Sequence, residues 1–365
     1  MKILQLIQKQ QLRGAEIFAA QLSEELFLMG NEVLLVSIFE GNQKLPFSGK
    51  HVCINAEASK RLFDRKSWKK LANLIAEFQP DIVQANAGDT LKYAAFSRIF
   101  FGWKAKLVFR NANLISGFIT NQSKKVFNQF LLRQVAGIAS VSAICADDFI
   151  QTFSFPEDKV SVLPIGVLKE KLVSSLPNDI SELLDGSEFL IHVGSFVPEK
   201  NHKDLFIIFD QVLLAYPNLK LLLLGEGPLK AQYQKQLADR PEIVFLGSRL
   251  DVDSILPFAK GLLLPSLIEG LPGVILEAMN NNVPVVSYGV GGIPELVIPE
   301  KTGWLVPVGE SEKFVNAVSQ ILSMNDKTKS RVTENAKKVV LQQYQIPIIA
   351  KKFESFYSKI LANSI

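Results

Sequence analysis

The sequence has 365 residues, 48% of them hydrophobic, which suits two domains with well-buried cores and excludes a disordered chain. Cys53 and Cys145 lie in apolar stretches, so they indicate small core residues rather than a disulfide or a metal pair. The N-terminus is too short and too polar for a signal peptide, and no apolar run reaches the roughly 20 residues of a membrane span. The expected location is therefore the cytoplasm.

The net charge of +4 is unevenly distributed. Residues 58–133 contain 14 Lys or Arg and 4 Asp or Glu, whereas residues 186–365 contain 18 of each class. Residues 91–106 therefore indicate either a basic amphipathic helix that rests on anionic lipid at the inner membrane face, or a surface helix whose aromatic side chains pack inward. No aromatic signature of an RNA-binding protein is present, so nucleic acid is not an expected partner. The aromatic residues interleaved with these cations are Phe96, Phe100, Phe101 and Trp103.

Apolar strand patterns alternate with helical patterns in the first half of the chain, which favours parallel sheets in an α/β fold. The expected helices there are Gly14–Met29 and Trp68–Phe78. The expected strands are Lys2–Gln8, Glu32–Phe39, Asp81–Ala87, Lys106–Ala112, Gly137–Val141 and Lys159–Ile165.

A polar segment precedes a second alternating series of strands and helices. We expect an N-terminal domain over 1–168, a connection over 169–186 and a C-terminal domain over 187–345, with a terminal helix over 346–365 that packs back on the first domain. The expected strands of this series are Phe189–Gly194, Leu219–Gly225, Ile243–Gly247, Gly261–Pro265, Val283–Ser287 and Trp304–Pro307. Its expected helices include Lys203–Tyr216, Lys230–Ala238 and Lys313–Ser323.

The most informative stretch is a strand, a turn and a helix start over residues 261–279. Pro272 suits the first turn of that helix, and backbone N–H groups from about Gly273 onward lack an intrahelical partner. These N–H groups and the helix dipole favour an anion, most plausibly a phosphate. Glu269 in the turn and Glu277 one helical turn inside would repel phosphate, so they are expected to bind hydroxyls on either side of it. A nucleotide sugar meets that demand.

Other turns at strand ends supply further candidates. Gly14 begins a helix, where it would let backbone approach a ligand closely, but the full dinucleotide fingerprint is missing. Lys200 follows the strand that ends at Gly194 and suits a diphosphate. Gly225 shapes a neighbouring turn, and Arg249 could seat a nucleobase. The three histidines lack metal-ligand spacing, so no metal site is expected.

Together these motifs resemble the retaining glycosyltransferases of family 4, which have the GT-B fold of two doubly wound, Rossmann-like parallel-sheet domains facing across a cleft. The E-x7-E element of that family matches Glu269 and Glu277, and its Gly-x5-Lys-Asn element matches Gly194 to Asn201. In the first domain, the residues from Arg13 to Glu16 resemble the donor-site glycine loop. The resemblance covers nearly the whole chain and is strongest in its second half.

The resemblance implies roles for these residues. Glu269 would bind hydroxyls of the transferred sugar and Glu277 the ribose, whereas Lys200 and Gly14 would help to hold the diphosphate without a bound metal or other cofactor. The family often has Arg after Gly194, where this chain has Ser195, and a first-domain His where Arg110 or Asn111 would substitute here. The implied donor-binding set is Gly14, Gly194, Ser195, Lys200, Gly225, Arg249, Glu269, Gly270, Leu271, Pro272, Gly273, Val274 and Glu277.

The function implied is that of a retaining hexosyltransferase-type glycosyltransferase (EC 2.4). It would move a sugar from a nucleotide-sugar donor to a hydroxyl of a glycan or lipid-linked saccharide in polysaccharide biosynthesis. Two rival hypotheses share the architecture. One is a non-catalytic or partner-dependent GT-B subunit, motivated by Ser195 and the missing His. The other is a sugar-nucleotide 2-epimerase, which would form product from the donor alone.

Overall fold

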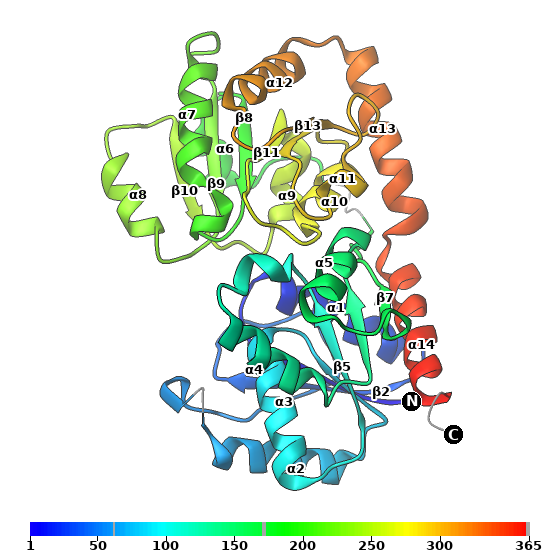
Figure 1. Cartoon of the computed structure of the whole chain (residues 1–365). Helices are drawn as coiled ribbons and strands as arrows, with labels where there is room; N and C mark the ends of the chain where they lie inside the picture. Colours follow the sequence, from blue (N-terminus) through cyan, green and yellow to red (C-terminus); the bar gives the residue numbers. More distant parts are fainter. Residues whose placement is uncertain (61–62, 170–172, 363–365) are drawn as a thin grey trace. The chain divides into compact units, whose positions relative to one another are not determined.

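The computed structural model describes residues 1–60, 63–169 and 173–362, which divide into two compact units (Figure 1). Unit 1 contains residues 1–166 and 346–365, and unit 2 contains residues 167–345. The predicted doubly wound α/β fold is confirmed, because each unit is built on a parallel sheet with helical crossovers. Among the described residues, no helix is long and apolar enough to cross a bilayer.

In unit 1, the described residues form a parallel sheet of seven strands in the order β3-β2-β1-β4-β5-β6-β7. The strands are β1 (Lys2–Lys9), β2 (Glu32–Phe39), β3 (Lys50–Cys53), β4 (Ile82–Ala85), β5 (Lys106–Asn111), β6 (Gly137–Ser140) and β7 (Val160–Val162). The helices are α1 (Gly14–Leu28), α2 (Arg65–Phe78), α3 (Gly88–Phe101), α4 (Gln122–Leu132), α5 (Ala143–Phe153) and α14 (Ile346–Ala362).

The two faces of the unit 1 sheet bury different helices. Alternation along β1 sends Leu4 and Leu6 into a core with α2, α3, α4 and α5, and Ile3 into a core with α1 and α14. The chain's last helix therefore packs on the first, α1, although the two are separated by more than 300 residues.

In unit 2, the described strands form a six-stranded parallel sheet in the order β10-β9-β8-β11-β12-β13. They are β8 (Phe189–Val193), β9 (Lys220–Leu224), β10 (Ile243–Gly247), β11 (Gly261–Leu264), β12 (Val285–Tyr288) and β13 (Trp304–Val306). The helices are α6 (Asn178–Leu184), α7 (His202–Leu213), α8 (Lys230–Gln236), α9 (Val252–Ile255), α10 (Gly273–Asn280), α11 (Ile293–Leu296), α12 (Ser311–Ser323) and α13 (Asp326–Gln343).

The predicted strands are confirmed to within three residues at each end, with three differences elsewhere. Strand β3 was missed, because its short sequence KHVC is a half-exposed sheet edge without apolar alternation. The helix predicted over 91–106 ends at Phe101, because Gly102 adopts φ 67° in the left-handed region and strand β5 begins soon after. The connection predicted over 169–186 contains helix α6, and its residues 170–172 lie outside the described residues.

A buried polar network joins α14 to the centre of the unit 1 sheet. The Tyr357 hydroxyl donates a hydrogen bond to Oε1 of Gln84 at 2.7 Å and accepts one from Nε2 of Gln5 at 3.2 Å. Gln5 and Gln84 face each other on β1 and β4, and the side chain of Asn86 donates to Oε1 of Gln5 at 2.9 Å. All four side chains are at most 2% exposed. This network lies where the strand order reverses, so it fixes α14 to the point where α/β sheets bind ligands.

We predict that Tyr357→Phe lowers the free energy of unfolding by about 1–3 kcal/mol, because Nε2 of Gln5 and Oε1 of Gln84 each lose a buried hydrogen bond to the hydroxyl. Urea denaturation followed by circular dichroism measures this. Tyr216→Phe is the matched control, since within the described part of the chain that hydroxyl makes one long hydrogen bond, 3.5 Å to the carbonyl oxygen of Ser319. Equal stability of the parent protein and Tyr357→Phe would show that the network contributes nothing.

Candidate active site

Two turns lie side by side at the carboxyl edge of the unit 2 sheet. One follows β8 and the other follows β11, the neighbouring strands between which the order reverses. The amide of Leu267 donates to the carbonyl oxygen of Glu199 at 2.8 Å, and Nδ2 of Asn201 donates to the carbonyl oxygen of Pro265 at 3.1 Å. Asn201 itself adopts φ 52°, a left-handed conformation that Asn tolerates, and so ends the first turn and begins α7. These contacts fix the two turns to each other.

The paired turns bring together two residues that the sequence analysis singled out. Nζ of Lys200 lies 2.5 Å from Oε1 of Glu269, and the side chains are 21% and 7% exposed. An ammonium group has three donor hydrogens, so Lys200 keeps capacity for a second acceptor while it holds Glu269. A cation and a carboxylate thus lie in contact at the sheet edge. When a ligand binds there, Lys200 can donate to an acceptor of the ligand and Glu269 can accept from a donor of the ligand.

Helix α10 begins directly after this turn. Pro272 is its N-cap residue, one position before the predicted first-turn place, and it makes no side-chain capping bond. Helix geometry leaves the N–H groups of Gly273 and Val274 without an intrahelical partner, and both residues are half-buried. Gly270 and Leu271 are buried in the turn that leads to them. The helix start therefore presents free amides and a positive dipole beside the Lys200–Glu269 pair.

Glu277 lies one turn inside α10 and is half-buried. Burial, with a smaller contribution from Asp253, raises its pKa to about 7. Among the described residues no hydrogen bond to its carboxylate contributes to this pKa. A desolvated carboxylate is suited to accept hydrogen bonds from the hydroxyls of a ligand.

Two further turns, each containing a glycine, pack closely against the turns after β8 and β11. Gly225 adopts φ 142°, and a Cβ there would lie 2.1 Å from the carbonyl oxygen of Gly194. Gly291 adopts φ 54°, and a Cβ there would lie 2.0 Å from the carbonyl oxygen of Glu269. Gly225, expected to bind the donor, thus contacts the Gly194 turn through its backbone. The half-buried Ser195 follows in that turn, and its carbonyl oxygen accepts from the amide of Val197 at 2.8 Å.

Two buried histidines, His192 and His202, pack next to each other and His192 lies against Gly194. The sequence analysis assigned them no role. His192 is fully buried, with Nδ1 at 2.8 Å from the carbonyl oxygen of Leu263, and the His202 ring stacks on Phe196 at a centroid distance of 4.2 Å. Burial lowers the pKa of His192 to about 4 and that of His202 to about 2, so both rings are neutral at physiological pH. The strand and helix patterns carry no signal for this pairing, since it depends on tertiary contacts.

Arg249 is held by two carboxylates. Its guanidinium donates to Asp251 at 2.8 and 2.7 Å and to Asp179 at 2.5 Å, and these bonds raise its pKa. The N–H groups along the edge of the Arg249 guanidinium therefore bind carboxylates of unit 2. Its planar face remains able to stack on a ring. The expectation that it seats a nucleobase stays a prediction.

In unit 1, the predicted residues lie at the carboxyl edge of that sheet. Gly14 begins α1 with open space around its Cα. Arg110 is 2% exposed, lies over the Phe18 ring at 4.3 Å, and has no partner for Nε or Nη1 among the described residues. Burial lowers its pKa to about 10 against the opposing effect of Glu16. In Asn111, in contrast, both donor hydrogens of the side-chain amide are used, because Nδ2 donates to Oγ of Ser140 at 3.2 Å and to the carbonyl oxygen of Cys145 at 3.0 Å.

We predict that Gly291→Ala destabilises unit 2 by about 1–3 kcal/mol more than Gly309→Ala. Both glycines have positive φ, 54° and 83°, but only the Gly291 substitution drives a Cβ into the Glu269 carbonyl, whereas nothing lies within 4 Å of a Cβ at Gly309. Thermal unfolding of the two variants measures the difference. Equal destabilisation would mean that the Gly291 turn does not support Glu269.

Comparison with known proteins agrees with this architecture. The family model "Glycosyl transferases group 1" matches residues 178–339, and "Glycosyltransferase Family 4" matches residues 12–170. Among solved structures, Anabaena HepE in complex with UDP and glucose has a TM-score of 0.82 and 20% identity over 98% of this chain and 100% of its own. Sucrose-phosphate synthase from Thermosynechococcus elongatus has a TM-score of 0.81 and 18% identity over 100% of both chains.

Curated relatives cover less of the chain. N-acetyl-alpha-D-glucosaminyl L-malate synthase of Bacillus anthracis is 30% identical over 180 residues, which are 48% of this chain and 47% of the relative. UDP-Gal:alpha-D-GlcNAc-diphosphoundecaprenol alpha-1,3-galactosyltransferase of Escherichia coli is 27% identical over 219 residues, or 56% and 55% of the two chains. The chain thus spans about half the length of these relatives. Because the two family models together match nearly the whole chain, this protein belongs to the family 4 glycosyltransferases of GT-B fold.

Proposed function

We propose that this chain is a retaining glycosyltransferase that transfers a hexose from a nucleotide-sugar donor to a hydroxyl of a glycan or lipid-linked saccharide. The observation that carries the proposal is the contact of Lys200 with Glu269 at 2.5 Å beside the uncapped start of α10. A diphosphate at that helix start would accept from the free amides and from Lys200, while the released Glu269 would accept from hydroxyls of the transferred sugar. Glu277 would accept from the ribose on the other side.

Charge development explains why these groups suit glycosyl transfer. Negative charge grows on the diphosphate as the glycosidic bond breaks, and preorganised amides and a lysine stabilise it without reorganisation. In this proposal Lys200 and the α10 dipole take the place that a metal ion has in other transferases. Retention of the anomeric configuration is part of the proposal, supported by the match to the family's E-x7-E element at Glu269 and Glu277.

UDP-sugars are the first donor class to test. The Escherichia coli relative is named for UDP-Gal, and structures similar in fold were solved with UDP and UDP-glucose. The same relative acts on a lipid-linked saccharide, which supports an acceptor of that class here. On the acceptor side we assign Arg110, whose buried cation has unused donors, rather than Asn111. Contact with an anionic membrane surface belongs to the same proposal, because lipid-linked acceptors lie there.

A transfer assay tests the proposal directly. The protein is incubated with radiolabelled UDP-sugars and a panel of lipid-linked saccharides, in buffer with and without EDTA. We expect product only when donor and acceptor are both present, at a rate that EDTA leaves unchanged. Nuclear magnetic resonance of the product then determines whether the anomeric configuration is retained. An altered sugar nucleotide from the donor alone would support the 2-epimerase hypothesis, and failure to bind any donor would refute the assigned donor site.

We predict that Lys200→Ala lowers the transfer rate about 100-fold, the usual cost of removing one preorganised group that stabilises developing negative charge. Lys203→Ala is the matched control, since Lys203 is an exposed lysine three residues along the chain. The control should keep the parent rate. A Lys200→Ala rate within twofold of the control would contradict the role given to Lys200.

We also predict that affinity for the nucleotide sugar rises about tenfold between pH 6 and pH 8. The pKa of Glu277 is raised to about 7, so the carboxyl is mostly protonated at pH 6 and ionised at pH 8, and only the ionised form accepts hydrogen bonds from two hydroxyls. Isothermal titration calorimetry measures the affinity. An intact nucleotide sugar is required, because a free nucleoside diphosphate carries a terminal phosphate that titrates in the same range.

Glu277→Gln is the control for this pH dependence. Its amide keeps the size of the side chain but does not titrate, so its affinity should be the same at pH 6 and pH 8 and weaker than that of the parent at pH 8. If the parent and the variant show the same change with pH, another group is responsible and Glu277 does not bind the ribose.

A further inference from the structure

We propose that the outer face of α2, α3 and α4 docks unit 1 on an anionic bilayer. This face, called here the aromatic–basic face, comprises Phe63, the exposed side chains of α2 and α3, and the exposed side chains of α4 from Gln122 to Phe130. The inference deepens the proposed function by naming the surface that would hold the protein beside lipid-linked acceptors. Its evidence is independent of the donor site, because it lies wholly within unit 1.

A continuous series of ring contacts runs across the three helices. Trp68 on α2 contacts Phe63 at a centroid distance of 5.3 Å and stacks on Phe96 and Phe100 of α3 at 4.8 and 5.3 Å. Phe96 in turn contacts Phe127 of α4 at 6.1 Å. Of the aromatic residues considered in the sequence, Phe96 thus packs inward against Trp68 and Phe127, whereas Phe100 stacks on Trp68 and also reaches the surface.

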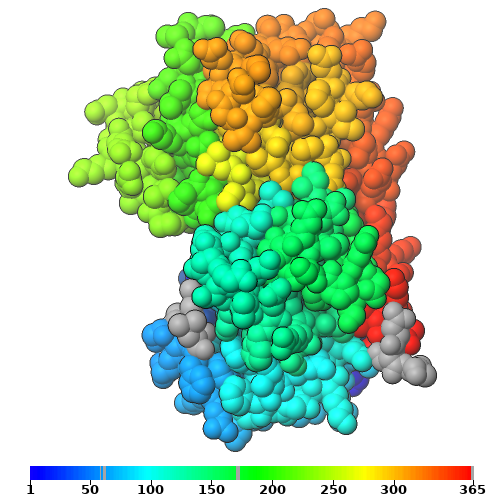
Figure 2. Space-filling view, in the orientation of Figure 1, coloured from blue at the N-terminus to red at the C-terminus, as the bar shows by residue number. Residues whose placement is uncertain are grey.

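The outer ends of this series are exposed to solvent. Phe63 is 66% exposed and Phe100 47% exposed, and on α4 Val126 and Phe130 are 54% and 41% exposed. Phe127, Val126 and Phe130 line an open apolar hollow of about 570 Å³ together with Gln122 and Ser123. In Figure 2 the residues of α3 and α4, coloured cyan to teal, form a continuous part of the near surface of unit 1. Exposed apolar groups gathered in this way indicate an interaction surface.

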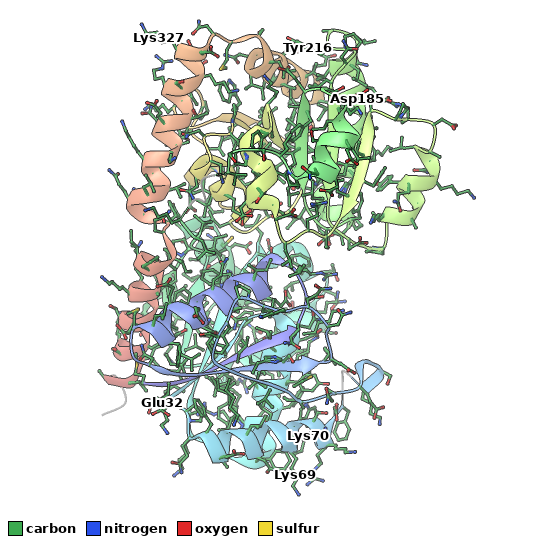
Figure 3. All side chains as sticks on the ribbon, turned by 180° about the vertical axis from the view of Figure 1, so that it is seen from behind. Glu32, Lys69, Lys70, Asp185, Tyr216 and Lys327 are labelled. Atoms are coloured by element: carbon green, nitrogen blue, oxygen red, sulfur yellow. The ribbon has the colours of Figure 1, made fainter. Side chains whose placement is uncertain are left out.

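Cations surround these apolar groups. On α2 the side chains of Arg65, Lys66 and Lys69 are exposed, as is Lys124 on α4, and Figure 3 shows Lys69 and Lys70 extending from α2. Asp64, next to Arg65 in sequence, is buried and accepts a hydrogen bond from the amide of Ser67, so it contributes little to the surface. The exposed Glu57 lines the same pocket as Arg65 and Lys66, and its charge is paired with Lys60 at 2.9 Å. The face thus combines exposed rings with positive charge, which is the pattern of proteins that lie on anionic lipid.

The positive charge of the aromatic–basic face favours a bilayer over a second copy of the chain as its binding partner. A symmetric dimer would place this face against its own copy and bring two surfaces of the same positive charge together. That contact would be repulsive, whereas phosphate and carboxylate headgroups neutralise the same cations. Aromatic rings with an apolar body also suit the boundary between headgroups and acyl chains. The bilayer is therefore the occupant that the face fits.

Vesicle cosedimentation of the full chain tests this proposal. We expect binding to vesicles of 40% phosphatidylglycerol in phosphatidylcholine at 0.05 M salt, and little binding at 1 M salt, where the screening length falls to about 3 Å. Phosphatidylcholine vesicles alone should bind at least tenfold more weakly. The double variants Phe100→Ser/Phe130→Ser and Lys66→Glu/Lys69→Glu should each lower the partition coefficient at least tenfold.

Matched controls use exposed residues elsewhere. Lys351→Glu/Lys352→Glu makes the same charge change on α14, on the opposite face of the unit 1 sheet, and Leu214→Ser removes an 81% exposed leucine from unit 2. Both controls should bind like the parent. Circular dichroism and donor affinity, measured without vesicles, establish that each variant is folded and keeps its donor site, so the membrane proposal and the proposed function can fail separately.

Three outcomes would overturn the proposal. The first is no cosedimentation of the parent at low salt, and the second is equal loss of binding in the α14 control. The third is a concentration-dependent dimer in analytical ultracentrifugation that Phe100→Ser/Phe130→Ser abolishes, which would assign the face to a second copy instead. Binding that depends on anionic lipid, on salt and on both face variants supports it.

Discussion

The hydrogen bonds between the turns after β8 and β11 are the constraint on which the candidate site depends. The bonds from Leu267 to Glu199 and from Asn201 to Pro265 join the two turns that carry Lys200 and Glu269. Because both turns follow adjacent parallel strands, the chain needs only short segments to place a cation, a carboxylate and a helix start together. The two neutral histidines are buried, and the glycine turns pack against the carbonyl oxygens of Gly194 and Glu269.

The groups near the corresponding edge of the unit 1 sheet have a different chemistry from those of the unit 2 site. Its polar groups are buried amides and a tyrosine hydroxyl from α14, and its cation, Arg110, lies over an aromatic ring rather than beside a carboxylate. Among the described residues, Nε and Nη1 of this buried guanidinium have no partner, and burial lowers its pKa to about 10 against the pull of Glu16. A site with free donors and hydrogen-bonding amides is better suited to a polar acceptor than to a diphosphate.

Much of this could be predicted from the sequence. The strands are short apolar runs and the crossover helices are periodic, so element type and the α/β class follow from pattern alone. Glu269 and Glu277 were predicted as site residues because they flank a helix start that follows an apolar strand, and that prediction needs only local sequence. Edge strand β3 lacked alternation, and α6 lay within a polar segment. The His192–His202 contact and the Arg249 ion pairs could not be predicted, because both join residues through tertiary contacts that leave no periodic trace.

The central claim is that a diphosphate binds at the start of α10 with Lys200 and Glu269 on one side and Glu277 on the other. Backbone amide chemical shifts during titration with a nucleotide sugar test it most directly, because they report on each N–H group separately. The account predicts large shifts at Gly273 and Val274, with little change at the start of α12, a helix of the same unit. Shifts confined to other helices, with Gly273 and Val274 unaffected at saturating ligand, would contradict it.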